Sequence, residues 1–283
     1  MHTQGNLDPT TSTRRDYSWG VGVSLIAAGI IYLLDQYLKT GWMDLLILPA
    51  CGLVLLSWGI VTRRFGLEIS GSLLTGLGLG GFLALSRFFS LGTNPRIGFL
   101  LLFFALGWGL ISLVRVWLFD KMCWWPLIPG SILAGVGLCF LVPWQPLNFV
   151  LYPVVGLSLA LLAWGLSDHL LGLIIPGSLL FGIGPGIYVA WSRPGLGNGL
   201  TQTGIMLVCF AIGWALITVL SRVMVSRFLW WPLIPGGILA MTGWGLFIGG
   251  SPQQALSFIG NTTSIGLILF GLYLLLWRSG LNK

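Results

Sequence analysis

The chain has 283 residues, of which 56% are apolar and only 7% charged, with a formal net charge of +7. Soluble domains carry about 25% charged residues, so this chain has too few polar groups to cover a soluble globule, and a soluble enzyme is excluded. The 42 glycines show no Gly-X-Y period, which excludes collagen, and the 15 Trp and 16 Phe residues exclude disorder. An integral membrane protein remains.

Along the chain, a polar segment at residues 1–17 is predicted to be a disordered cytoplasmic tail, and residues 18–283 a polytopic transmembrane domain. A spanning helix needs about 20 mostly apolar residues. The runs are apolar all round, whereas a membrane β-barrel needs alternation, so the predicted fold class is an all-α integral membrane protein. Ten runs qualify, near 19–38, 43–61, 67–86, 97–117, 125–142, 148–166, 170–191, 202–220, 231–249 and 260–277.

The loop charges predict the orientation of these spans. If the N-terminus and every second loop share one side, that side holds ten of the 14 Lys and Arg residues. Short cytoplasmic loops carry an excess of Lys and Arg. We therefore expect both termini in the cytoplasm and the chain in a bacterial cell (inner) membrane. Since the basic residues stand singly or in pairs between apolar runs, they do not indicate nucleic acid binding.

The sequence also repeats itself at an offset of 106 residues. Trp19, Trp125 and Trp231 share this spacing, and the segment WWPLIPG at 124–130 returns at 230–236. A shorter two-helix unit of about 50 residues lies within the repeat, so the spans are predicted to form five like-oriented hairpins, unlike inverted-repeat transporters. The predicted tandem duplication has copies at about 19–124 and 125–230, with a partial third copy at 231–278.

Small residues recur on the predicted helices and indicate close helix packing. In the odd-numbered runs they fall at i, i+4 and i+7, which lines one helix face. Lipid gives helices little hydrophobic reason to associate, so small faces matter because they let backbones approach. A substrate groove lined by glycine is the alternative interpretation. The candidate packing residues are Gly71, Gly76, Gly78, Gly80, Gly130, Gly177, Gly182, Gly186 and Gly236.

Two tryptophan pairs stand at the cytoplasmic start of predicted spans, Trp124-Trp125 and Trp230-Trp231. Indole rings prefer the headgroup level, so these four residues are predicted interfacial anchors. The prolines that follow them suit the first helical position. Pro185 falls in the middle of a run and predicts a kink.

Ionisable residues inside a membrane are functional candidates, and the predicted spans carry almost none at mid-depth. Glu68 and Arg115 lie near inner ends, where Arg115 is expected to snorkel to the interface. Arg87 and Arg193 occupy equivalent outer ends, so they are candidate contacts for an anion or lipid headgroup, with snorkelling as the alternative. The four cysteines form no CxxC pair, and His169 is the one histidine outside the tail. We predict no catalytic, cofactor or metal site, and no enzyme.

Some hairpin motifs resemble a known family. The Trp125-Pro126-Leu127-Ile128 start and the stretch from Gly29 to Asp35 resemble bacterial LiaI/LiaF-like transmembrane hairpin repeats, over most of residues 18–278. HdeD-like short-repeat membrane proteins are a second resemblance. Both imply multi-pass accessory membrane proteins linked to envelope stress or regulation, generally without an enzymatic site.

The sequence therefore predicts a multi-pass bacterial membrane protein that acts as a non-enzymatic scaffold, an accessory subunit or an envelope-related regulatory protein. Its expected partners are the lipid bilayer and either another membrane protein or further copies of this chain. Two alternatives stay open. One is a transporter of an uncharged or lipid-like substrate, which needs no buried charge, and the other is a pigment- or quinone-associated subunit, suggested by the 13% aromatic content.

Overall fold

The computed structural model describes residues 9–38, 43–85, 92–119, 122–192, 199–225, 229–249, 253, 257–258, 260–268 and 271. Over these ranges the chain consists of helices and their connections, without a strand. The elements are α1 (Pro9–Leu38), the 3-10 helix η1 (Met43–Leu46), α2 (Ile47–Thr62), α3 (Phe65–Leu85), α4 (Thr93–Phe119), α5 (Leu127–Leu141), α6 (Asn148–Ser167), α7 (Leu171–Trp191), α8 (Gly199–Val225) and α9 (Leu233–Gly249).

Six of the described helices are long and apolar enough to cross a membrane, and the chain is therefore a multi-pass helical membrane protein. They are α1, α3, α4, α6, α7 and α8, while α2, α5 and α9 are apolar but shorter. A helix of 16 residues such as α2 is about 24 Å long, less than the hydrocarbon core, and η1 continues it at its start. Of the last predicted span, 260–277, residues 260–268 are helical and most of the remainder lies outside the described residues.

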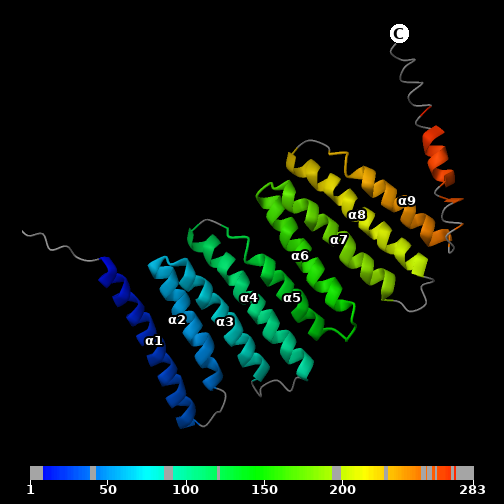
Figure 1. Ribbon diagram of the computed structural model, residues 1–283. Coiled ribbons are helices and arrows are strands. Elements are labelled where there is room, and N and C mark those ends of the chain that lie inside the picture. The colour runs from blue at the N-terminus through cyan, green and yellow to red at the C-terminus, as the bar shows by residue number, and fades with distance from the viewer. Residues whose placement is uncertain are drawn as a thin grey trace, which may run out of the picture. The chain divides into compact units, whose positions relative to one another are not determined.

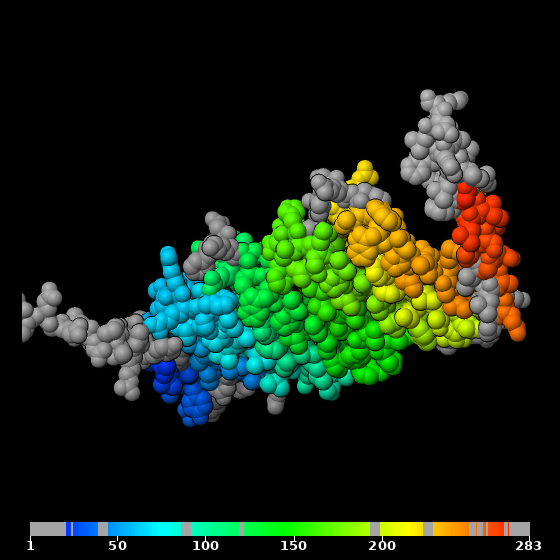
Figure 2. All heavy atoms as spheres, turned by 45° about the horizontal axis from the view of Figure 1, so that its top comes forward, coloured from blue at the N-terminus to red at the C-terminus, as the bar shows by residue number. Residues whose placement is uncertain are grey.

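The chain divides into two compact units, Met1–Trp144 and Gln145–Lys283. Within each unit the helices lie side by side in chain order and form a single layer (Figure 1). The substantial helix contacts join successive helices: α2 to α5 form one such series in the first unit, and α6 to α9 form another in the second. In the space-filling view the colours of α2 to α5 accordingly follow one another across the first unit (Figure 2).

Two pairs of successive helices, α2–α3 and α6–α7, are joined by very short connections. Between α2 and α3, Arg63 adopts a left-handed backbone with φ of 52°, and between α6 and α7 His169 does the same with φ of 54°. In each turn the next residue donates its N–H to a carbonyl of the preceding helix, that of Gly59 at 3.0 Å or Gly165 at 2.9 Å. Left-handed residues of this kind end many helices by satisfying their last carbonyls. The turns therefore reverse the chain within one helix diameter.

Glycines set the spacing between neighbouring helices. All nine candidate packing glycines have an atom of a neighbouring helix, either the preceding or the following one, within 3.1 Å of the place where a Cβ would stand. At the α3–α4 contact, a Cβ on Gly76 would lie 2.7 Å from Cα of Gly107. At the α7–α8 contact, a Cβ on Gly182 would lie 3.1 Å from Cα of Gly213. Where the nearest atoms are backbone, as at Gly76, a side chain would push the two helices apart.

Two further glycine contacts escaped the sequence analysis. In α4 and α5, a Cβ on Gly98 would lie 2.9 Å from the carbonyl oxygen of Gly137, and in α8 and α9 a Cβ on Gly204 would lie 2.5 Å from that of Gly243. Helices α4 and α8 thus also approach the helix that follows each of them through backbone atoms. Such contacts therefore join α3 to α4, α4 to α5, α7 to α8 and α8 to α9.

We expect Gly76→Ala and Gly182→Ala to lower the free energy of unfolding by about 1–3 kcal/mol each, because the added methyl group overpacks a backbone contact. Gly81→Ala is the matched control, since Gly81 lies in the same helix as Gly76 and a Cβ there would meet nothing within 4 Å. Its expected effect is a stabilisation of up to about 1 kcal/mol from helix propensity. Titration with a denaturing detergent, followed by circular dichroism, measures all three; equal responses would contradict the account.

Candidate functional site

The predicted anchor tryptophans meet tryptophans of the preceding helix. The ring of Trp125, just before α5, lies 5.8 Å from that of Trp108 in α4, at an interplanar angle of 82°. The ring of Trp231, just before α9, lies 5.9 Å from that of Trp214 in α8, at 80°. Edge-to-face pairs of this kind add about 0.5–1.5 kcal/mol beyond area burial.

The other two predicted anchors lie beside this pairing, with Trp124 half-buried and Trp230 exposed. Sequence analysis placed tryptophan pairs followed by proline at the start of two predicted spans, but did not pair them with Trp108 and Trp214. The signal that could have paired them is their shared spacing of 106 residues. These tryptophans therefore act at a helix contact as well as near a helix end.

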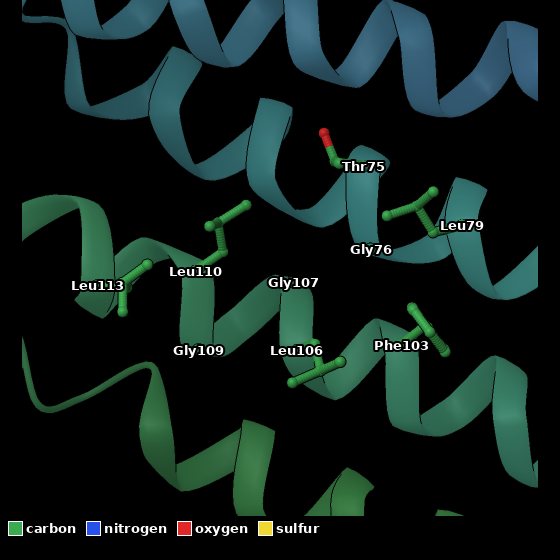
Figure 3. A pocket seen from close by; sticks show the side chains of 9 residues that line it. All are labelled: Thr75, Gly76, Leu79, Phe103, Leu106, Gly107, Gly109, Leu110 and Leu113. Carbon is green, nitrogen blue, oxygen red and sulfur yellow. The ribbon is translucent and has the colours of Figure 1, made fainter.

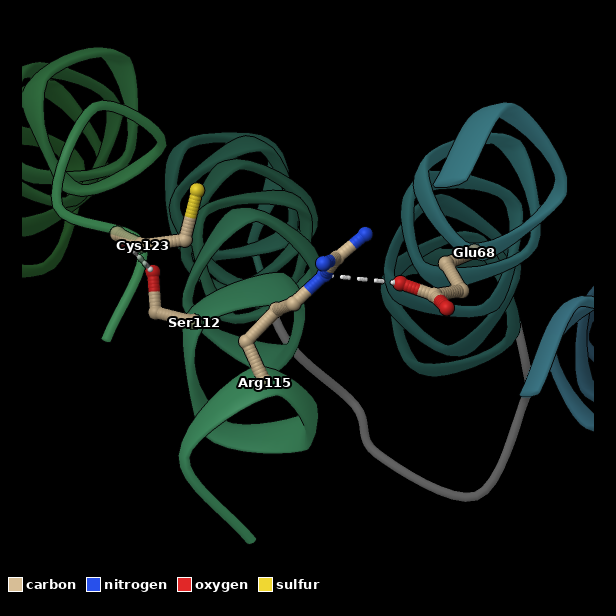
Figure 4. Close-up of polar contacts among 4 residues, drawn as sticks. All are labelled: Glu68, Ser112, Arg115 and Cys123. Carbon is tan, nitrogen blue, oxygen red and sulfur yellow. Dashed lines mark hydrogen bonds and ion pairs between the residues drawn. The ribbon is translucent and has the colours of Figure 1, made fainter. Parts of the chain in front are cut away.

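An ion pair joins α3 to α4 in the first unit. Arg115 donates its Nε–H to Oε2 of Glu68 at 3.0 Å, although 47 residues separate the two in the chain (Figure 4). Its guanidinium also lies 4.1 Å from the ring centre of Phe65, a cation–π contact. Sequence analysis placed both residues near inner ends without pairing them; antiparallel packing sets the last part of α4 beside the first turn of α3.

Glu68 is the more buried partner, with 2% of its side chain exposed against 25% for Arg115. Its other carboxylate oxygen, Oε1, has no hydrogen-bond partner among the described residues. Glu68 lies in the first turn of α3, where the helix macrodipole favours a negative charge. Burial still disfavours the charged carboxylate, so the fold tolerates Glu68 in this position because Arg115 supplies a counter-charge.

The second unit has no charges at the corresponding places. The residues that lie 106 positions later are Ile174 and Ser221, both fully buried. The neighbouring hydroxyl of Ser112, which donates to the carbonyl of Cys123 at 2.6 Å, corresponds to Thr218. Two otherwise similar helix pairs are thus joined by different chemistry at this end.

An apolar groove of about 450 Å³ lies between α3 and α4 (Figure 3). Gly76 and Gly107 stand where the two helices touch, and Gly109 lines the groove from α4. The hydroxyl of Thr75 donates to the carbonyl of Gly71, one turn earlier in its own helix, at 2.7 Å. The side chains around the groove are those of Thr75, Leu79, Phe103, Leu106, Leu110 and Leu113.

The remaining predicted site residues, Arg87 and Arg193, lie outside the described residues. Elsewhere, the buried hydroxyl of Ser158 in α6 donates to the carbonyl of Gly177 in α7 at 2.8 Å, whereas three other buried hydroxyls have no hydrogen-bond partner among the described residues, those of Ser72, Ser178 and Thr218. In the part of the chain that the structure describes, no three His, Cys, Asp or Glu side chains form a group that could hold a metal ion.

Comparison of the chain with protein-family models, with curated proteins and with solved structures found no match. What the sequence and structure establish is a multi-pass helical membrane protein built from layers of neighbouring helices.

The contribution of the ion pair to stability can be tested by introducing, at positions 68 and 115, the residues that the second unit has at the corresponding positions. Arg115→Ser should lower the free energy of unfolding by about 3–5 kcal/mol, because it leaves the buried carboxylate of Glu68 without a counter-charge. The double change Glu68→Ile with Arg115→Ser installs the residues found at positions 174 and 221. It should restore the stability of the parent or exceed it, because apolar replacement of a buried pair is often neutral or better.

Detergent-induced unfolding measures both variants, and Arg96→Ser is the control. Arg96 is an exposed arginine of the same helix, so its loss should change stability by less than about 0.5 kcal/mol. A double variant as unstable as Arg115→Ser alone would show that the ion pair has a role beyond compensating the buried charge.

Proposed function

We propose that the protein is a non-enzymatic scaffold or accessory subunit of a membrane assembly, and that its open helix layers present docking surfaces to membrane partners. The observation that carries this proposal is the single-layer arrangement, in which each helix packs mainly against its neighbours in the chain. One layer of helices encloses no interior. Its two faces are available for contact with lipid and with other proteins.

The exposed side chains on these faces support a docking role. Leu106 and Leu113 on α4 are 62% and 58% exposed, and Ile212 and Val219 on α8 are 57% and 61% exposed. Each α8 residue lies 106 positions after its α4 counterpart. Apolar faces in a bilayer cost nothing against lipid tails, and they become interfaces where a partner offers better packing.

We also infer that α2 to α5 and α6 to α9 descend from one duplicated four-helix module. The glycine contacts, the edge-to-face tryptophan pairs and the left-handed turns all occur in both series at the same offset. In arrays where a repeat contacts only its neighbours, further repeats extend the surface without rebuilding a core. Duplication would therefore enlarge a docking surface, which agrees with a scaffold.

Two further elements complete the proposal. The resemblance to LiaI/LiaF-like hairpin repeats implies an accessory role of the same kind in a bacterial envelope. The excess of Lys and Arg on one set of loops supports a cytoplasmic location for both termini.

Transport of a lipid-like substrate is the second candidate, and the groove between α3 and α4 is the observation that favours it. The groove lies on one helix layer, so a closed pathway would require several copies around a common axis. Flux of a fluorescent lipid in proteoliposomes tests it directly: flux above that of protein-free vesicles supports transport, and its absence removes this candidate.

The scaffold proposal predicts that the full chain, extracted from its own membrane in several mild detergents, keeps a membrane protein at fixed stoichiometry or forms an oligomer of defined size. Mass measurement by native mass spectrometry identifies either outcome. Gly76→Ala provides a comparison, because a distorted α3–α4 contact should weaken the assembly. A lone monomer in every detergent would overturn the proposal.

A further inference from the structure

We propose that the groove between α3 and α4 binds an acyl chain of a membrane phospholipid. This inference is independent of the scaffold role and needs only that the two helices span the bilayer. The floor of the groove is the backbone contact of Gly76 with Gly107, and its walls are side chains of both helices. Phe103 and Leu110 extend from α4 toward α3 and bound it on either side of this contact (Figure 3).

The lining selects a hydrocarbon. The groove is walled by aliphatic and aromatic side chains, and the hydroxyl of Thr75 already donates to the carbonyl of Gly71. A polar headgroup or a polar side chain of a partner would lose its hydrogen bonds there. Both walls belong to the apolar spans Phe65–Leu85 and Thr93–Leu118. At that depth the bilayer itself supplies acyl chains, and a volume of about 450 Å³ is in the range of ligand pockets.

Gly109 contributes open space to the groove. A glycine inside a helix weakens it relative to alanine, so it usually has a packing reason. Gly76 and Gly107 have that reason, because a Cβ on either would meet backbone atoms of the facing helix within 3.2 Å. A Cβ on Gly109 would meet nothing within 4 Å. Helix packing does not require this glycine, and its lack of a side chain leaves space in the groove.

The second unit offers an internal comparison. The residues 106 positions after Thr75 and Gly109 are Phe181 and Ala215, and Pro185 takes the place of Leu79. Phe181 and Ala215 are larger than their counterparts, and each would narrow a groove at this place. We therefore expect the chain-binding groove to be a property of the first unit, at a place where the two proposed copies have diverged.

Photolabelling tests the proposal on the full chain in phosphatidylcholine nanodiscs. A trace of phosphatidylcholine carries a diazirine midway along one acyl chain, and mass spectrometry locates the labelled peptides after irradiation. Labelling of residues 103–113 should exceed labelling of residues 209–219 several-fold. Gly109→Leu, which projects a side chain into the groove, should abolish this excess. Ala215→Leu, the matched change in α8, should leave it intact.

The alternatives give different results. Equal labelling of the two segments in the parent, or an excess that survives Gly109→Leu, would overturn the proposal. So would a lack of label at 103–113 together with disulfide cross-linking between copies that carry Leu113→Cys, because the occupant would then be a second copy. Gly109→Leu should retain its helical circular dichroism, and Leu106→Trp, at an exposed wall position, is a second groove-filling variant with the same expected loss.

Discussion

Backbone contact between neighbouring helices is the constraint on which this structure depends. In a bilayer, apolar side chains gain little by leaving lipid for a protein contact, so helices associate through close packing and hydrogen bonds. Here glycine meets glycine or a backbone carbonyl at the contacts from α3 to α5 and from α7 to α9. Short left-handed turns at Arg63 and His169 join α2 to α3 and α6 to α7.

The single layer, the groove between α3 and α4 and the Glu68–Arg115 ion pair follow from this constraint. A helix that uses narrow glycine faces against the helices before and after it keeps its broader apolar faces for lipid or partners. Where the α3–α4 backbones touch, the surrounding large side chains stand apart and leave the groove. Near the end of the same contact, Glu68 and Arg115 replace apolar packing by an ion pair. The α3–α4 contact of the first unit therefore carries an ion pair, whereas the corresponding α7–α8 contact has uncharged residues at these positions.

Sequence analysis predicted apolar helices from local periodicity, and six of the described helices are long and apolar enough to cross a membrane, with three shorter apolar ones. It did not predict the ion pair, since the partners lie 47 residues apart and meet only through the rotation of α3 against α4. It also did not pair Trp108 with Trp125, and it did not distinguish Gly109, whose open surroundings depend on the neighbouring helix. The local sequence pattern predicts which face of a helix carries small residues. Which residues that face contacts depends on which helix packs against it and on how the two helices are rotated.

The distance between α2 and α5 tests the single layer most directly. Spin labels at Leu53 and Ile132, exposed positions on these two helices, can be measured by pulsed electron resonance in nanodiscs. Three successive helix spacings of about 8–10 Å predict a separation of about 25–30 Å. A closed four-helix bundle would instead bring α2 beside α5 at roughly 10 Å. That shorter distance would contradict the open layer and with it the basis for the proposed docking surfaces.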